Sequence, residues 1–304
     1  MDAQMLAFNP EPGVAEKVEP NVRRILAPNP SPMTFRGTNT YLVGETELAV
    51  IDPGPDNAQH LEAILSALQP DQSITHICVT HAHLDHSPLA RALSDHTGAP
   101  IFAFGGPESG RSSVMQALAQ TGLAGGGEGV DQAFVPDVLV EDASVIQGPD
   151  WTLEVIHTPG HFGNHISFAL GDICFVGDHV MGWASSLVSP PDGDLTDFMA
   201  SCEKLSARPW QVFHAGHGAP IDTPSERLKW LMDHRRAREA DILETLKAGP
   251  GTAEALATLI YKDTPAELLP AATRNVFAHL IDLQGKSLVE ALDGLRVDAV
   301  FRRL

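Results

Sequence analysis

Short apolar runs alternate with segments of helical periodicity along most of the chain. Runs typical of strands occur at residues 38–43, 48–52, 74–79, 151–156, 173–176 and 210–213. Between them, residues 58–68 and 112–121 predict amphipathic helices. Residues 1–34 are rich in proline and predict an irregular opening segment. Alternating strands and helices are typical of an α/β domain with parallel or mixed sheets.

The pattern changes near residue 224. Residues 225–247 predict one long helix, which the sequence Gly249-Pro250-Gly251 ends. Two shorter helices are predicted at residues 252–260 and 265–283, and two strands within residues 287–302. We therefore expect two domains, spanning residues 1–224 and 225–304.

Four side chains that bind metal ions follow the apolar run at residues 74–79. They are His81, His83, Asp85 and His86. In an extended chain, residues i and i+2 point to the same side, so His81 and His83 are placed to bind one ion together. Three histidines and one aspartate in this order predict a metal site.

The next two residues predict how the second half of this run is oriented. Ser87 is a favourable N-cap and Pro88 a favourable first helical residue. A helix is therefore expected to begin there, and the turn into it directs Asp85 and His86 toward a second ion.

Three later strand-like runs end in side chains of the same kinds. They are followed by His157 and His161, by Asp178, and by His214 and His217. With Asp52 in the sequence Ile51-Asp52-Pro53-Gly54, these motifs resemble, in order, those of the metallo-β-lactamase superfamily. The resemblance spans roughly residues 35–220 and implies a four-layer αββα sandwich.

The predicted order of helices followed by a hairpin resembles the winged-helix domain appended to one branch of this superfamily. That branch also carries the sequence found here at residues 37–43, Gly-Thr-Asn-Thr-Tyr-Leu-Val. It includes a mitochondrial lactamase-like endoribonuclease and thioesterases acting on polyketides. The resemblance therefore implies an α/β (α+β) protein, a metallo-β-lactamase sandwich with a small C-terminal winged-helix domain.

The resemblance assigns the metal ligands residue by residue. It implies one ion bound by His81, His83 and His161 and another bound by Asp85, His86 and His217, with Asp178 bridging the two. Asp52 would orient a ligand, because a metal-bound histidine usually donates its other N–H to an acceptor. Imidazole and carboxylate donors suit two Zn²⁺ ions, with Mn²⁺ or Fe²⁺ as alternatives. Asp85 and Asp178 are the expected catalytic residues: Asp178 holds the ions together, and Asp85 also accepts or passes a proton.

The remaining histidines leave several interpretations open. His214 competes with His217 for the last ligand position, and the following Gly218 favours His217. His165 supports the site, polarises the substrate, or is a strand-start histidine bonded to backbone. His157 is expected to support a ligand from behind. His179 either faces the mouth of the site or, as we expect, lies in a solvated loop. Ordinary surface or packing positions are expected for His60, His76, His96, His234 and His279.

Two other segments are singled out by composition. The loop after Asp178 carries Met181 and Trp183, which either line a substrate pocket or, for Trp183, pack under the loop. The glycine-rich run at residues 122–129 lacks the Gly-Lys-Ser/Thr ending of a phosphate loop, and a mobile surface segment is expected instead.

Composition favours a cytoplasmic enzyme. No apolar stretch approaches the ~20 residues needed to span a bilayer, and the N-terminus has no secretory signal. Cys78, Cys174 and Cys202 form an odd set without ligand spacing, and packed thiols suit a reducing compartment. No membrane partner is expected, and a homodimer is an open possibility.

Charge separates the candidate substrates. Residues 1–224 hold 8 Lys+Arg against 27 Asp+Glu, whereas residues 225–304 hold 12 of each. A protein that binds nucleic acid needs several cations to replace phosphate counterions, and the helix at residues 265–283 has only Arg274. Nucleic acid is therefore a disfavoured partner, and the small domain is expected to pack, dimerise or close a pocket.

These observations predict a dinuclear metal-dependent hydrolase. A metal-bridging hydroxide is expected to attack a small ester, thioester or lactone. The presence of Asp178 argues against a β-lactam substrate, because enzymes of the superfamily that hydrolyse β-lactams generally lack this aspartate. The alternative is a single-stranded-RNA endoribonuclease, which the motifs allow and the charge disfavours.

Overall fold

The computed structural model describes residues 5, 7–123, 129–262, 265 and 268–304. Residues 124–128, within the glycine-rich run, lie outside the described residues. Among the described residues, no helix is both long and apolar enough to cross a membrane.

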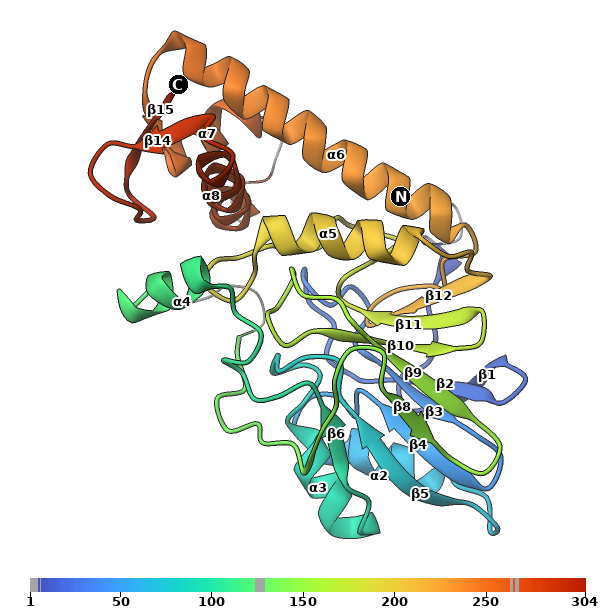
Figure 1. Ribbon diagram of the computed structural model, residues 1–304. Helices are drawn as coiled ribbons and strands as arrows, with labels where there is room; N and C mark the ends of the chain where they lie inside the picture. The colour runs from blue at the N-terminus through green and yellow to red at the C-terminus, as the bar shows by residue number, and fades with distance from the viewer. Residues whose placement is uncertain (1–4, 6, 124–128, 263–264, 266–267) are drawn as a thin grey trace.

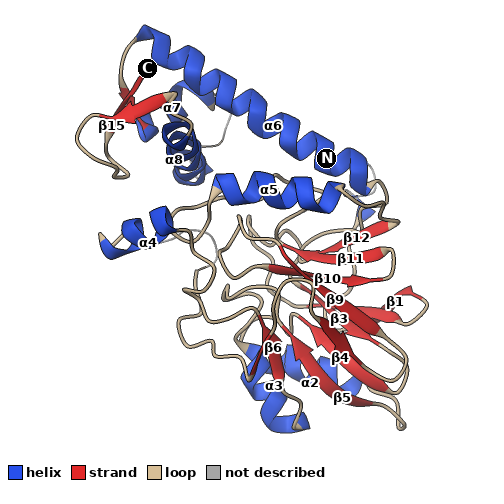
Figure 2. Ribbon diagram, in the orientation of Figure 1, coloured by secondary structure: helices blue, strands red, loops and turns tan. Residues whose placement is uncertain are grey.

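Two β-sheets face one another at the centre of the molecule (Figures 1 and 2). The first has the strand order β1-β2-β3-β4-β5-β6-β7 and the second the order β12-β11-β10-β9-β8. The first sheet comprises β1 (Ala15–Glu19), β2 (Val22–Leu26), β3 (Asn39–Val43), β4 (Glu47–Ile51), β5 (Ser73–Cys78), β6 (Ile101–Ala103) and β7 (Val138–Leu139). The second comprises β8 (Val145–Gln147), β9 (Thr152–His157), β10 (Ile166–Leu170), β11 (Ile173–Gly177) and β12 (Val212–Ala215).

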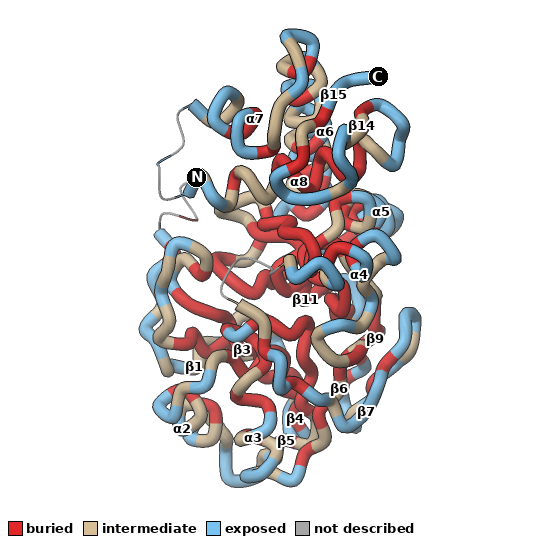
Figure 3. The backbone as a smooth tube through the Cα atoms, turned by 90° about the vertical axis from the view of Figure 1, so that its left-hand side faces the viewer, coloured by how far each residue is buried: buried red, intermediate tan, exposed pale blue. Residues whose placement is uncertain are grey.

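Helices cover both outer faces, which confirms the expected four-layer sandwich. Ile64 of α2 (Ala58–Ser66) and Leu93 of α3 (Leu89–Thr97) pack on the first sheet. Phe198 of α5 (Leu195–Ser206) and Leu231 of α6 (Pro224–Thr245) pack on the second. Between the sheets, Tyr41, Phe168 and other side chains form a shared core, which appears as the buried centre in Figure 3.

The prediction of an irregular opening segment is wrong for residues 15–26. These residues form β1 and β2, which pair antiparallel, and β2 pairs in turn with β3. The proline at position 20 lies in the turn between the two strands, where no ladder hydrogen bond is lost. The prolines of this segment lie outside β1 and β2, so the high proline content did not exclude strands.

The C-terminal residues form a smaller unit that packs against α5 and α6 (Figure 1). It contains α7 (Ala253–Ile260), α8 (Leu269–Gly285) and the strands β13 (Gly251–Thr252), β14 (Val289–Ala291) and β15 (Val300–Arg303) in the order β13-β15-β14. Its own core includes Phe277 and Phe301, and α4 (Ser113–Gln120) joins that core through Met115 and Leu118. The predicted helices and hairpin are present, and β13 is an additional strand.

Candidate metal centre

The histidines and aspartates singled out in the sequence converge at one edge of the two sheets. The His81–His86 segment follows β5, His161 lies in the turn between β9 and β10, Asp178 follows β11 and His217 follows β12. The strands β4 and β5 run parallel, as do β11 and β12, so their carboxyl ends meet at the same edge. Strand direction therefore brings together residues that are far apart in the sequence.

The first group of possible metal ligands consists of His81, His83 and His161, all buried. Nδ1 of His83 lies 2.8 Å from Nε2 of His81 and 3.1 Å from Nε2 of His161. Three imidazole nitrogens converge on one small volume, which is the arrangement of a three-histidine metal site.

The second group consists of Asp85, His86, Asp178 and His217. Nε2 of His217 lies 3.1 Å from Oδ2 of Asp85 and 3.2 Å from Oδ2 of Asp178. The same Oδ2 of Asp178 is 3.8 Å from Nε2 of His161. Asp178 therefore contacts both groups, and within the second group His217 contacts both carboxylates. His214 instead has its Nε2 at hydrogen-bond distance, 3.2 Å, from Oε1 of Glu19, and its ring stacks on Phe175.

Asp52 supports one histidine of each group. Its Oδ2 accepts from Nδ1 of His86 at 2.9 Å and from the Thr80 hydroxyl at 2.7 Å, while Oδ1 accepts the Thr80 backbone N–H. Because the Thr80 hydroxyl donates to Asp52, its oxygen accepts from Nδ1 of His81, 3.0 Å away. One carboxylate thus sets the ring orientation of two histidines, whose Nε2 atoms face the other candidate ligands.

Two backbone carbonyls have the same effect on the other ligands. Nδ1 of His161 lies 2.7 Å from the Leu187 carbonyl oxygen, and Nδ1 of His217 lies 3.1 Å from that of Gly37. Leu187 and Gly37 were not predicted from the sequence, because a carbonyl oxygen is common to every residue type. No signal short of the tertiary structure identifies these supports.

Burial keeps the first group neutral. It lowers the pKa of His83 to about 3, lowers that of His81 well below its usual value, and lowers that of His161. A neutral imidazole is the form that binds a metal ion. These three side chains therefore need no deprotonation at neutral pH.

Carboxylates reverse this effect in the second group. Burial opposes a charge on His217, but Asp178 and Asp85 raise its pKa to about 10. The same balance raises the pKa of His86 well above its usual value. Without another cation, these two carboxylates attract protons onto the neighbouring rings, and a divalent ion would replace those protons.

The donor set fits a pair of metal ions. Oδ1 of Asp85 and Oδ1 of Asp178 are buried without a hydrogen-bond partner among the described residues. A buried carboxylate oxygen without a partner is costly unless a cation neutralises it. Histidine and aspartate donors in these numbers, with their outer hydrogen bonds in place, meet the requirements of a dinuclear site.

The structure places three further histidines near the site. His165 is buried; its Nδ1 bonds the Thr158 hydroxyl, and its Nε2 has no hydrogen-bond partner among the described residues. His157 stacks on Phe104 at 3.8 Å and its Nε2 lies 3.2 Å from the Gly163 carbonyl oxygen, so it braces the turn that carries His161. The prediction that His179 lies in a solvated loop is wrong, because its ring is fully buried and contacts Cys202 at 3.5 Å.

The helix after the histidine run begins one residue later than predicted. α3 starts at Leu89 with Pro88 as the residue before it. The Ser87 hydroxyl does not cap this helix; it donates to Asp131 at 2.8 Å. The backbone N–H groups of His86 and Ser87 both bond the His83 carbonyl, so these residues form a turn directly before the helix.

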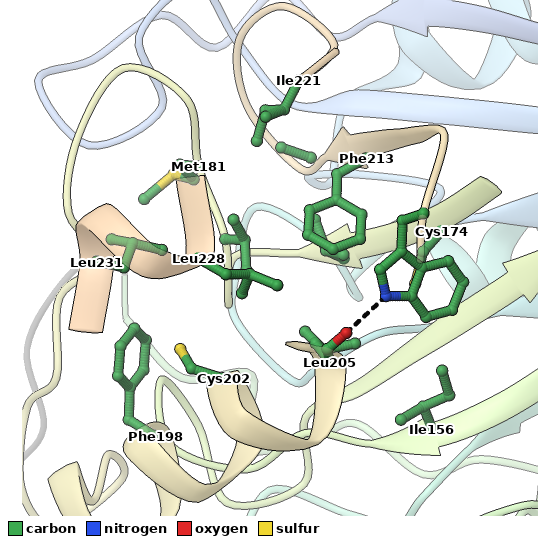
Figure 4. Close-up of a cluster of buried hydrophobic side chains, with 14 of the residues drawn as sticks. Ile156, Cys174, Met181, Phe198, Cys202, Leu205, Phe213, Ile221, Leu228 and Leu231 are labelled. Atoms are coloured by element: carbon green, nitrogen blue, oxygen red, sulfur yellow. Dashed lines mark hydrogen bonds between the residues drawn. The ribbon is translucent and has the colours of Figure 1, made fainter. Parts of the chain in front are cut away.

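Met181 and Trp183 have different surroundings. Met181 is buried beside Leu228 and Leu231, as Figure 4 shows, and this packing favours a core role. Trp183 is partly exposed and stacks on Phe35 with the ring centroids 5.3 Å apart. Phe35 has a φ of 58°, which is uncommon for an aromatic residue, and it precedes the Gly37 carbonyl that supports His217.

Comparison with protein families agrees with this fold and site. The model of the metallo-beta-lactamase superfamily matches residues 33–229, and that of the beta-lactamase associated winged helix domain matches residues 252–295. The chain therefore belongs to the metallo-beta-lactamase superfamily, as the sequence motifs predicted. It is a hydrolase of that superfamily with a C-terminal winged-helix domain.

Individual relatives extend over most of the chain. A Beta-lactamase-like protein 2 homolog from Drosophila melanogaster is 32% identical, with 87% of this chain and 88% of the relative covered. An Atrochrysone carboxyl ACP thioesterase from Claviceps purpurea (strain 20.1) is 29% identical, with coverage of 85% and 77%. A beta-lactamase domain protein from Burkholderia ambifaria has the same fold, with a TM-score of 0.81 at 19% identity, covering 98% of this chain and 96% of that protein.

Proposed function

We propose that the protein is a dinuclear metal-dependent hydrolase of a small ester, thioester or lactone. The observation that carries this proposal is the position of Asp178, whose Oδ2 lies within 3.2 Å of His217 and 3.8 Å of His161. A carboxylate in contact with both ligand groups is suited to hold two cations close together. Two Zn²⁺ ions fit the donor types, and Mn²⁺ or Fe²⁺ would also be accommodated.

The candidate ligands and the residues that support them would have separate roles in this reaction. Two bound cations would supply Lewis acidity toward a carbonyl oxygen and a lowered pKa for water. The first ion would be held by His81, His83 and His161, and the second by Asp85, His86 and His217. Asp178 keeps both groups in register, and Asp85, with its Oδ1 unpartnered, is placed to accept a proton. Asp52 holds the rings of His81 and His86 in fixed orientations.

The acyl substrate class is favoured by charge and by the named thioesterase relatives. Residues 1–224 carry an excess of 19 acidic groups, and a polyanionic substrate would be repelled by that excess. Arg274, the one arginine of α8, donates to the Ser189 hydroxyl at 3.2 Å, so it is directed into the protein. Single-stranded RNA remains the alternative substrate.

The test is a substrate panel with metal-loaded protein. Acyl thioesters, esters, lactones and single-stranded RNA are assayed side by side, with the His81→Ala variant as the control for contaminating activities. Turnover of an acyl substrate that is lost in His81→Ala supports the proposal. Cleavage of RNA alone, also lost in that variant, would establish the alternative.

We propose the division into residues 1–224 and 225–304, with the start of α6 packed on the second sheet through Leu228 and Leu231. The support is that Phe277 and Phe301 share a cluster which contains none of the sheet residues of the catalytic part. Limited proteolysis followed by mass spectrometry would test it, with cleavage expected at residues 220–223, directly before α6.

A further inference from the structure

The loop from residue 179 to residue 194 connects two parts of the proposed metal centre. It begins directly after Asp178 and ends at α5. Midway along it, the Leu187 carbonyl accepts from Nδ1 of His161 at 2.7 Å. Whatever fixes Leu187 therefore fixes the rotation and the tautomer of His161, and with them the direction of its Nε2 atom.

Side chains of α6 hold this loop by its backbone. Arg227 donates to the carbonyl oxygens of Met181 at 2.7 Å and Ala184 at 2.6 Å. Arg235, two turns further along the helix, donates to the carbonyl of Ser186, the residue before Leu187. The long helix that begins at Pro224 is thus attached to the loop at three successive points.

Asn275 of α8 holds the other side of Leu187. Its Oδ1 accepts the Val188 backbone N–H at 3.2 Å and Nη1 of Arg235 at 3.0 Å. Arg235 and Asn275 are therefore bonded to each other and to the two residues that flank Leu187. This closed set of hydrogen bonds restrains the carbonyl that supports His161.

The environment of Arg235 indicates that these contacts are specific. Only 3% of the residue is exposed, and burial lowers the pKa of its guanidinium to about 10, so it stays charged at neutral pH. Its guanidinium carbon lies 5.0 Å from the centroid of the Phe198 ring. A buried charge is expensive unless it is hydrogen-bonded; here the Ser186 carbonyl and the Asn275 amide oxygen accept two of its hydrogens, while Nε has no hydrogen-bond partner among the described residues.

We infer that Arg235 and Asn275 are positioning residues for His161, acting through the Leu187 carbonyl. The C-terminal helices α6 and α8 would then help to position one ligand of the first group. Arg227 and Arg235 of α6 would bind the 179–194 loop and not nucleic acid. This inference rests on the proposed assignment of His161 as a metal ligand. It assigns no contact with substrate to either residue.

The test uses the full-length protein and three variants of the contacts between the catalytic part and α8. Asn275→Leu removes the acceptor for Val188 and Arg235, and Asn275→Asp retains it. Thr196→Val is the matched control, because it breaks a 2.8 Å hydrogen bond between α5 and Asp282 of α8 that does not touch the loop. The affinities for Zn²⁺ are measured by competition with a chromophoric chelator, and the His161 Nδ1–H signal is followed by NMR in the metal-free protein.

We expect Asn275→Leu to weaken one of two Zn²⁺ affinities by about 10–100-fold, the magnitude typical of a lost outer support of a metal ligand. The weakened affinity should be the one that His161→Ala also reduces, and the Nδ1–H signal of His161 should shift or exchange faster. Asn275→Asp should restore both readouts, and Thr196→Val should change neither. Should Asn275→Leu fail to fold, Arg235→Lys carries the same expectation, since it keeps the charge and loses the paired geometry.

The inference is overturned if Asn275→Leu weakens both Zn²⁺ affinities equally and Thr196→Val does the same. Arg235 and Asn275 would then only stabilise the fold as a whole. An unchanged His161 signal in Asn275→Leu would also overturn it. If the unaltered protein binds fewer than two ions, the proposed function fails instead. The NMR comparison still decides the positioning role in that case, because it needs no bound metal.

Discussion

Asp52 and His86 are joined by a hydrogen bond of 2.9 Å between Oδ2 of the carboxylate and Nδ1 of the imidazole. The same carboxylate reaches His81 through the Thr80 hydroxyl, so a single side chain serves both ligand groups. Asp52 itself has a φ of 50°, a left-handed conformation that aspartate tolerates better than most residues. The strained turn after β4 thus directs the carboxylate toward both histidines.

Asp52→Asn should weaken metal binding at both groups by about 10–100-fold, the range typical of a lost outer hydrogen bond. An amide in place of the carboxylate directs its NH₂ group either toward Nδ1–H of His86 or toward the backbone N–H of Thr80. In both orientations, two hydrogen-bond donors face each other. Chelator competition measures the two affinities. A loss confined to one group would contradict the shared role of Asp52.

Metal content should reach two transition-metal ions per chain, one for each ligand group. His161→Ala should lower the affinity of the first site and His217→Ala that of the second, because each removes one donor from one group. Elemental mass spectrometry of the dialysed proteins gives the count. A fully loaded value of one ion, or normal binding in His217→Ala with a loss in His214→Ala, would refute the assignment.

Metal binding to the second group should release protons at neutral pH, and binding to the first should release none. The pKa of His217 is raised to about 10 and that of His86 is raised as well, so both tend to be protonated in the metal-free protein, whereas the pKa of His83 is lowered to about 3. Calorimetry in buffers of different ionisation enthalpy measures this release. The dissociation of metal on acidification should accordingly begin at the second group.

Asp178→Asn should reduce hydrolysis by at least ~10²-fold and lower the metal content, because it removes the negative charge in contact with both groups. Asp172→Asn is the matched control, since Asp172 is an exposed acid at the opposite end of β11. Steady-state kinetics and elemental analysis of the two variants give the comparison. Equal behaviour of the two variants would place the bridge elsewhere.

Trp183→Ala should destabilise the protein by about 2–3 kcal/mol, somewhat less than the ~3–5 kcal/mol for a fully buried tryptophan. The ring is partly exposed yet packs with Phe35 and with the cluster of Met5 and Phe8. Trp230→Ala on α6, where the side chain is 47% exposed, should change the melting temperature little. A higher KM without a change in melting temperature would instead identify Trp183 as a wall of the substrate pocket.

Local sequence determined many of the helices and strands and the side chains that converge at the candidate site. Strand-length apolar runs predicted β3, β4, β5, β9, β11 and β12, and the side chains that follow several of these strands are the ones that converge. This worked because metal-binding chemistry needs particular residue types, and because a strand end places the next side chain at the sheet edge. The helices of the C-terminal unit were likewise predicted by their apolar periodicity and glycine stop signals.

Only the tertiary structure identified the backbone groups that support those donors. The Leu187 and Gly37 carbonyls, the burial of His179 and the attachment of the 179–194 loop by Arg235 and Asn275 join segments distant in sequence. The proline-rich opening was likewise found to contain β1 and β2, since strand pairing depends on a partner strand. A backbone carbonyl, a buried environment and a pairing edge are properties of position in space, and no single residue type encodes them.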